Sequence, residues 1–268
     1  MKETKIGFIG LGQMGRGMAR NVVKAGFPTF VYDLNKEVLR ELQQCGATIA
    51  KSCKDVGMRS DVVITMVRDD HQTEDVVRQV LKGIKKEGII LVMSTVSPSL
   101  IRSLARRSKR EKGVYLLDAP VSGLQTKADE GTLCIMVGGN KQAFKKSRAI
   151  LETMGNRIFH CGKVGTGEVA KITNGAICIS NMGILAQVIP LGLKQGLRPD
   201  VQRKIYESST GASYMLSQWD NLNIWRKDPK FVELQTKDLK LGLELAEESK
   251  MRLPIASATY DFDFLIKD

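Results

Sequence analysis

Histidine and tryptophan are scarce in this sequence, with two of each in 268 residues. The two histidines, His71 and His160, lie far apart and belong to no ligand-like cluster, so we expect no metal site. The five cysteines are scattered and form no C-x-x-C pair. This pattern predicts neither a disulfide framework nor a zinc site, and it indicates reduced, mostly buried thiols.

Internal repeats and low-complexity segments are also absent. No apolar run is expected to be long enough to cross a bilayer, and no signal-peptide pattern precedes the first expected strand, so we expect a cytoplasmic location. With 43% hydrophobic and 26% charged residues, the composition is that of a soluble globular protein. The length is sufficient for two domains, each with its own core.

Acidic residues are outnumbered by basic ones, which gives a formal net charge of +12. The densest basic cluster lies between residues 102 and 112, in a segment with an amphipathic helical pattern. No aromatic residues are interleaved with it, which favours a solvated helix face over a nucleic-acid site. We therefore do not expect nucleic-acid binding, although a positive field would attract small anionic substrates.

The stretch from Lys5 to Asp33 has the pattern of a strand, a glycine-rich turn, a helix and a second strand. Gly10, Gly12 and Gly15 have G-x-G-x-x-G spacing. The first glycine permits a sharp turn, the second leaves no Cβ between the backbone and a pyrophosphate, and the third lets the helix pack close to its strand. The free N–H groups at the start of the helix would then face the phosphate. The pattern predicts a dinucleotide-binding turn, since a strand-turn-helix without a ligand would leave the glycines unexplained.

Asp33 stands at the end of the second expected strand, about 20 residues beyond the glycines, where an acid binds the ribose of a dinucleotide. A carboxylate accepts hydrogen bonds from two ribose hydroxyls but repels a 2′-phosphate. The sequence therefore predicts NAD in preference to NADP.

The remaining pattern predicts an α/β fold of Rossmann type followed by an all-α domain. Helices are expected over residues 35–45 and 73–81, and strands over 48–49, 61–67, 89–93, 115–118, 133–137 and 158–160. Glycines at 162, 165 and 167 suggest a linker, after which helical periodicity dominates. We therefore expect an NAD-binding domain over residues 1–162 and a helical substrate and dimerisation domain over 163–268.

Several residues follow the expected parallel strands, whose carboxyl ends meet at one edge of the sheet. Met66, Val67 and Arg68 are expected beside the glycine turn, and Thr95 is expected beside a cofactor. For Thr95 alone, a cap or turn hydroxyl before Pro98 is the favoured explanation.

Lys171 and Asn174 are three residues apart in the first helix after the glycines, so they share one face. A lysine in a cleft can donate a proton to a carbonyl oxygen that is being reduced, and its ammonium stabilises the developing alkoxide. From the pattern alone, a surface lysine on a helix is the more common explanation.

Seven motifs occur in order along the chain. They are IGFIGLGQMGRGMARN at 6–21, MSTVSP at 93–98, DAPVSG at 118–123, GTL at 131–133, GTGEVAKITN at 165–174, SSTGAS at 208–213 and FVELQTKDL at 231–239. In these motifs the sequence resembles the β-hydroxyacid dehydrogenase family, which includes 3-hydroxyisobutyrate dehydrogenase, tartronate semialdehyde reductase and, more distantly, 6-phosphogluconate dehydrogenase. The resemblance implies an NAD(P)-dependent oxidoreductase that acts on a small β-hydroxy acid or its semialdehyde, and a homodimer paired through the helical domain.

The resemblance also assigns roles to individual residues. It implies that Lys171 is the general acid/base, that Ser122 and Gly123 bind the substrate carboxylate, and that Asn174 assists at the substrate. Other residues are implied as cofactor contacts. They are Leu11, Gln13, Met14, Met66, Val67, Arg68, Thr95 and Lys237.

The sequence departs from the family pattern at several positions. Leu124 replaces a second glycine, Gly175 replaces a second asparagine, and Arg68 replaces a proline. The chain also ends sooner after Pro254 than the family does, which would alter the dimer contact or a wall of the cleft. These departures leave open a reductase of an amine, sulfonate or phosphonate analogue, or a dinucleotide-binding protein without catalysis. The presence of Lys171 argues against the latter.

Overall fold

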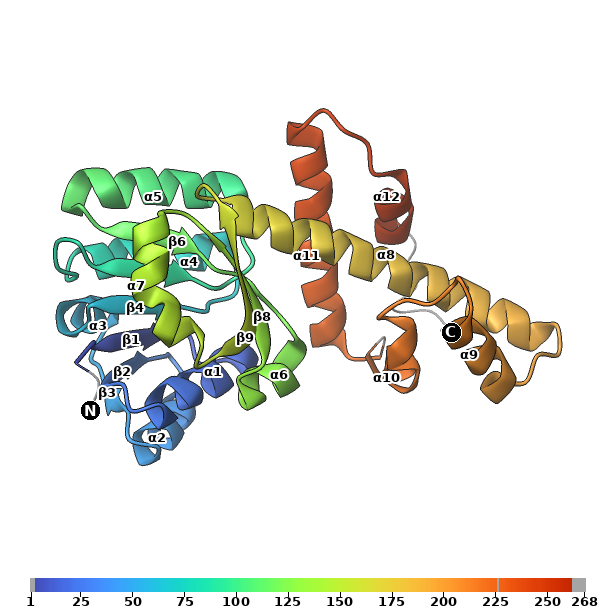
Figure 1. Ribbon diagram of the computed structural model, residues 1–268, viewed down its shortest axis with the longest axis horizontal. Helices are drawn as coiled ribbons and strands as arrows, with labels where there is room; N and C mark the ends of the chain where they lie inside the picture. The colour runs from blue at the N-terminus through green and yellow to red at the C-terminus, as the bar shows by residue number, and fades with distance from the viewer. Residues whose placement is uncertain (1–2, 226, 262–268) are drawn as a thin grey trace. The chain divides into compact units, whose positions relative to one another are not determined.

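The computed structural model describes residues 3–225 and 227–261 (Figure 1). It has two compact units, Met1–Lys171 and Ile172–Asp268. All of the strands in the described residues belong to the first unit, and the second unit is helical. The expected change from an α/β fold to an all-α fold is therefore confirmed. The expected effect of the short C-terminal end concerns residues 262–268, which lie outside the described chain.

A single mixed sheet forms the centre of the first unit, with strand order β3-β2-β1-β4-β5-β6-β8-β7 and β9 paired with β8. The neighbouring pairs from β3 to β6 are parallel, β8 is antiparallel to β6 and β7, and β9 is parallel to β8. The chain order reverses between β1 and β4, which is where this class of sheet binds nucleotides. The strands are β1 (Ile6–Ile9), β2 (Thr29–Tyr32), β3 (Thr48–Ile49), β4 (Val62–Thr65), β5 (Ile89–Val92), β6 (Tyr115–Asp118), β7 (Val121–Ser122), β8 (Leu133–Gly138) and β9 (Gly155–Gly162).

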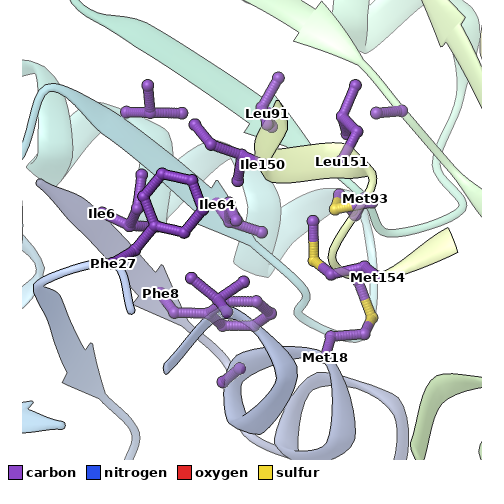
Figure 2. Packing of buried hydrophobic residues seen from close by; sticks show 14 of the residues in the cluster. Ile6, Phe8, Met18, Phe27, Ile64, Leu91, Met93, Ile150, Leu151 and Met154 are labelled. Atoms are coloured by element: carbon purple, nitrogen blue, oxygen red, sulfur yellow. The ribbon is translucent and has the colours of Figure 1, made fainter. Parts of the chain in front are cut away.

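Helices cover both faces of this sheet, because successive strand residues point to opposite sides. Ile64 and Leu91 pack into one core, shown in Figure 2, whereas their neighbours Val63 and Ile90 pack into the other. The first core is closed by α1 (Gln13–Lys24), α2 (Lys36–Gln44), α6 (Leu124–Glu130) and α7 (Lys141–Leu151). The second core is closed by α3 (Cys53–Arg59), α4 (Asp70–Leu81) and α5 (Pro98–Lys112). No sequence pattern predicted α3, α6, α7 or β7.

Standard caps fix the two ends of α5. The Ser97 hydroxyl accepts a hydrogen bond from the N–H of Leu100 at 3.4 Å, and Pro98 takes the first helical position, where its missing N–H costs nothing. At the other end, Gly113 adopts a left-handed conformation with φ 66°. These caps hold the basic residues of α5 on a helix of defined length.

The glycines expected to form a linker are instead packed against the sheet, and α8 (Thr166–Lys194) already begins between them. Gly165 and Gly167 are buried, and a Cβ on Gly167 would overlap the carbonyl oxygen of Met136. The helix then continues without a break through the division at Lys171. The glycines therefore allow close packing at the start of α8, where Gly165 and Gly167 had been expected to form a linker.

The second unit has its own hydrophobic core, built from α8 and the helices that follow it. Ile179, Met182 and Leu185 of α8 pack there with Leu239 and Ala256. The later helices are α9 (Pro199–Ser208), the 3-10 turn η1 (Leu216–Gln218), α10 (Trp219–Trp225), α11 (Pro229–Glu248) and α12 (Pro254–Asp261).

The apolar residues of α8 extend around the helix beyond this core. Ile179 is 2% exposed, whereas Ile177 is 65% and Leu191 59% exposed. Apolar side chains on more than one side of this helix are therefore left uncovered within the described part of a single chain. The expectation that no apolar run is long enough to cross a bilayer is wrong by length and composition alone, since an 18-residue window of α8 has a mean hydropathy of 1.7. One such helix is weak evidence for a membrane span, because the long core helix of a soluble protein meets the same test.

Candidate cofactor and catalytic site

The three spaced glycines form a tight turn between β1 and α1. Gly10 has φ 90°, and a Cβ added to it would overlap the carbonyl oxygen of Met66. A Cβ on Gly15 would overlap the carbonyl oxygen of Gly10. Gly12 differs, because no described heavy atom lies within 4 Å of its Cβ position. Two glycines therefore permit the packing of the turn, and the third leaves open space in front of the first turn of α1.

Asp33 is fastened to this turn from the end of β2. Its carboxylate accepts the N–H of Leu11 at 2.6 Å and the N–H of Asn35 at 2.7 Å. Each oxygen has a remaining lone pair and can accept a further hydrogen bond. The side chain of Leu11 is only 1% exposed and lies in the hydrophobic core, so Leu11 takes part in the turn through its backbone.

A cavity of about 470 Å³ joins these elements, within the 300–1,000 Å³ typical of small-molecule sites. It includes several residues that were predicted as cofactor contacts. They are Gly10, Gly12, Asp33, Met66, Val67 and Arg68. Other lining residues, such as Leu34 and His71, were missed. Leu34 directly follows Asp33 and is 88% exposed, so an apolar residue after the acid is the signal that identifies it.

Backbone hydrogen bonds position the end of β4 in this cavity. The N–H of Met66 donates to the carbonyl of Ile9 in β1 at 2.8 Å. The N–H of Val67 donates at 2.8 Å to the hydroxyl of Ser94, which is 2% exposed at the end of β5. Arg68 follows and is exposed. The expected meeting of these strand ends beside the glycine turn is therefore present.

The other predicted cofactor residues lie outside the lining of this cavity. Gln13 is the exposed first residue of α1, and Met14 is half-buried against the core. Thr95 is half-buried directly after Ser94. Lys237 belongs to α11 in the second unit, where its ammonium lies 3.1 Å from the carboxylate of Asp238.

The expected carboxylate-binding residues occupy a strand end and the turn after it. Ser122 ends β7 and pairs with Cys134 of β8. Gly123 has φ 147°, and a Cβ on it would lie 2.8 Å from Cβ and Cδ of Lys127. Leu124 keeps a left-handed backbone with φ 60°, a conformation that normally favours glycine. Leucine thus adopts a glycine-like backbone at the position where the family pattern has a second glycine.

Two buried carboxylates position the start of α8. Asp118, at the end of β6, is fully buried and accepts the N–H of Gly165 at 2.8 Å and of Glu168 at 3.0 Å. The carboxylate of Glu168 is also fully buried and accepts the N–H of Val96 at 3.3 Å. Burial raises the pKa of Asp118, and the backbone N–H groups oppose this effect. The first turn of α8, one turn before Lys171, is thereby fixed to the strand ends.

The same part of the first unit also contains Lys171. Burial raises the pKa of the Cys134 thiol, and the positive charges of Arg157, Lys127 and Lys171 oppose the increase. Because Cys134 pairs with Ser122, Lys171 is in the electrostatic surroundings of the expected carboxylate site. Asn174 is exposed on the next turn of α8, in the second unit. Within the described chain, no group of three His, Cys, Asp or Glu side chains is arranged to hold a metal.

Two family models match the chain, one for each part. The NAD binding domain of 6-phosphogluconate dehydrogenase matches residues 5–162. The model described as NAD-binding of NADP-dependent 3-hydroxyisobutyrate dehydrogenase matches residues 165–262.

Named relatives are similar over most of the chain. The 2-(hydroxymethyl)glutarate dehydrogenase of Eubacterium barkeri is 36% identical, covering 98% of this chain and 89% of that protein. The NAD-dependent L-serine dehydrogenase of Pseudomonas aeruginosa is 35% identical, covering 94% and 89%. A mouse mitochondrial 3-hydroxyisobutyrate dehydrogenase is 37% identical, covering 78% of this chain and 63% of that protein. Among solved structures, the Mycobacterium tuberculosis 3-hydroxyisobutyrate dehydrogenase with L-serine has a TM-score of 0.91 at 27% identity, covering 98% and 93%.

Proposed function

Because the chain belongs to the β-hydroxyacid dehydrogenase family, we propose that it moves a hydride between NAD(H) and a small β-hydroxy acid or its semialdehyde. The observation that carries the proposal is the cavity shared by the glycine turn, Asp33 and the end of β4. The open space at Gly12 suits a pyrophosphate, and Asp33 suits a ribose. The substrates in the relatives' names share a hydroxyl on the carbon β to a carboxylate.

In this proposal Lys171 is the general acid/base for the oxygen on the reacting carbon. During oxidation its amine would accept the hydroxyl proton, and NAD, when bound, would supply the acceptor for the hydride. During reduction its ammonium returns a proton to the carbonyl oxygen. Ser122 and Gly123 hold the substrate carboxylate through a hydroxyl and a backbone N–H, and Asn174 orients the substrate.

The first experiment measures NADH formation from NAD with 3-hydroxyisobutyrate, L-serine, glycerate, 2-(hydroxymethyl)glutarate and sulfonate analogues. Lys171→Met is compared with Lys194→Met, which removes the same charge from the other end of α8. We expect turnover of at least one β-hydroxy acid, lost in Lys171→Met and kept in Lys194→Met. Turnover of a sulfonate alone would change the substrate class. Binding of NADH without any turnover in either direction would favour a dinucleotide-binding protein without catalysis.

The preference for NAD over NADP is a separate part of the proposal and rests on Asp33. Two N–H groups fix its carboxylate, so a 2′-phosphate would meet an anion that has little freedom to turn away. We expect NADH to bind more tightly than NADPH, and Asp33→Ser to reduce the difference. Equal affinity of the wild type for both cofactors would contradict this assignment.

A homodimer is proposed from the exposed apolar side chains of α8. A second copy would cover residues such as Ile177, Ile184 and Leu191, which are 65%, 46% and 59% exposed in the single chain. Light scattering of the purified protein tests this, and a monomeric mass at micromolar concentration would contradict it.

Domain roles and location complete the proposal. We assign NAD binding to residues 1–162, and substrate binding and dimerisation to 163–268, close to the limits of the two family models. The separately expressed segment 1–162 is expected to bind NADH without turnover. The cytoplasmic location expected from the sequence stays a proposal, and cell fractionation tests it.

A further inference from the structure

A second cavity, of about 580 Å³, lies between α5 and the loop that leads from β9 to α8. It shares no lining residue with the cofactor cavity. Five of its seven lining residues are basic and none is acidic. The basic residues are Arg102, Arg106, Lys109 and Arg110 from α5, and Lys163 from the loop. Ala105 and Val164 supply a small apolar surface between them.

Most of this charge is not balanced by acidic side chains. Glu111, the single acidic residue in α5, lies 3.0 Å from the guanidinium of Arg107 and 3.8 Å from that of Arg110. Three other cations line the cavity besides Lys109 and Arg110, and none of the three forms an ion pair with a residue that the structure describes. These are Arg102, Arg106 and Lys163.

Helix electrostatics explain only part of the cluster. Cations in the last turn of a helix are stabilised by its dipole, which accounts for Lys109 and Arg110. The ammonium of Lys109 also lies 3.9 Å from the centroid of the Tyr115 ring, so a cation–π contact holds it. Arg102 and Arg106 lie in the first two-thirds of α5, away from the last turn, and like charges four residues apart repel each other.

We propose that this cavity binds a small soluble anion that carries two or more phosphate groups. Guanidinium groups bind phosphate through paired hydrogen bonds, and Lys163 adds a cation from a second segment. The cavity is shallow and largely open to solvent, and its volume of about 580 Å³ accommodates a compact ligand. The described lining contains no aromatic side chain on which a base would stack, which favours a compact phosphate ligand over single-stranded nucleic acid.

The same cavity adjoins the segment that positions Lys171. A Cβ on Gly165 would lie 3.0 Å from Nε of Arg102, so the two residues are in close contact. The N–H of Gly165 donates to the buried Asp118, and α8 begins at the next residue. A ligand that bridges Arg102 and Lys163 would therefore stabilise the junction at the start of α8, and thermal unfolding should reveal this.

The test is calorimetric titration of the full-length protein with tripolyphosphate at physiological salt and saturating NADH, which occupies the cofactor cavity. Arg102→Gln/Arg106→Gln is compared with Lys145→Gln/Lys146→Gln, which removes the same charge from exposed positions of α7. We expect binding at one site per chain in the wild type and the α7 variant, and a loss of about tenfold or more in affinity in the α5 variant. The wild-type melting temperature should rise with ligand, and that of the α5 variant should not.

Three results would overturn the proposal. Equal affinity of both variants would mean that net charge, rather than this cavity, attracts the anion. Absence of saturable tripolyphosphate binding to the wild type would exclude the site. Binding of RNA or of phosphoinositide vesicles without tripolyphosphate binding would identify a macromolecular surface instead. None of these results depends on turnover, so they leave the proposed dehydrogenase activity untouched.

Discussion

Replacement of Gly12 by alanine separates cofactor binding from folding more cleanly than any other change in this chain. Gly12 has φ −65° and ψ −163°, at the edge of the β region that alanine adopts, and beyond its chain neighbours no described heavy atom lies within 4 Å of the new Cβ. We therefore expect the free energy of unfolding to change by less than about 0.5 kcal/mol. The methyl group would nevertheless occupy the open space through which a pyrophosphate approaches the backbone.

The expected consequence is a weaker complex with NADH. An increase of about tenfold in the dissociation constant corresponds to about 1.4 kcal/mol, which is modest for a methyl group that prevents close approach of a phosphate. Fluorescence titration with NADH measures the affinity, and urea unfolding without cofactor measures stability.

Gly15→Ala is the matched comparison, with the same added methyl group three residues along. Its Cβ would overlap the carbonyl oxygen of Gly10 and lie 3.3 Å from the Phe8 ring. Backbone has to move, so we expect a destabilisation of about 1–3 kcal/mol, as for other overpacked sites. The reasoning is refuted if Gly12→Ala binds NADH as tightly as the wild type, or if the two variants unfold at the same urea concentration.

Three further predictions concern stability. Burial and the charge of Asp75 raise the pKa of Cys53 to about 11. Between pH of about 9 and about 11 the folded thiol therefore keeps a proton that the unfolded thiol loses. The free energy of unfolding should fall as pH rises through this range. Urea unfolding at pH 8.5 and 10.5 should show that the wild type loses about 2 kcal/mol more stability than Cys53→Ala. Equal losses in the two proteins would contradict the prediction. Gly175→Ala should raise the free energy of unfolding by about 1 kcal/mol, because this helical glycine has room for a Cβ. A lower melting temperature than that of the wild type would show that the added methyl group does not fit. Leu124→Gly should be more stable than Leu124→Ala by about 1 kcal/mol, because both variants lose the leucine side chain but only glycine adopts φ 60° without strain. The opposite order of stability in urea unfolding would disprove the left-handed conformation.

Local sequence determined the first βαβ segment, because there each residue type has a distinct physical task. The structure confirms the strand, glycine turn, helix and second strand, and Asp33 bonds to the turn as an acid at that strand end can. The strand runs at 62–65 and 89–92 were also predictable, since buried parallel strands are continuously apolar. The change to helices after residue 162 followed from periodicity alone.

Shorter elements escaped prediction because tertiary contacts stabilise them. The strand β7 has two residues, and its antiparallel pairing with β8 supplies hydrogen bonds that no local pattern indicates. The seven-residue helices α3 and α6 are likewise too short to show a clear period. Gly165 and Gly167 were misinterpreted as a linker, because a glycine needed for flexibility and a glycine needed for close packing look the same in a sequence.

The sequence by itself thus determined the fold class and the dinucleotide turn, because these depend on residue type, spacing and order. The lysine with which the chemistry is proposed came from the family resemblance. Only the tertiary structure revealed how the first turn of α8 is fixed. Asp118 and Glu168 are separated by 50 residues in sequence, yet one carboxylate accepts the backbone N–H of the other residue in a fully buried site. Only the tertiary structure also brought Lys163 to the basic face of α5. Burial and the meeting of distant segments arise from packing of the whole chain, and no local pattern encodes them.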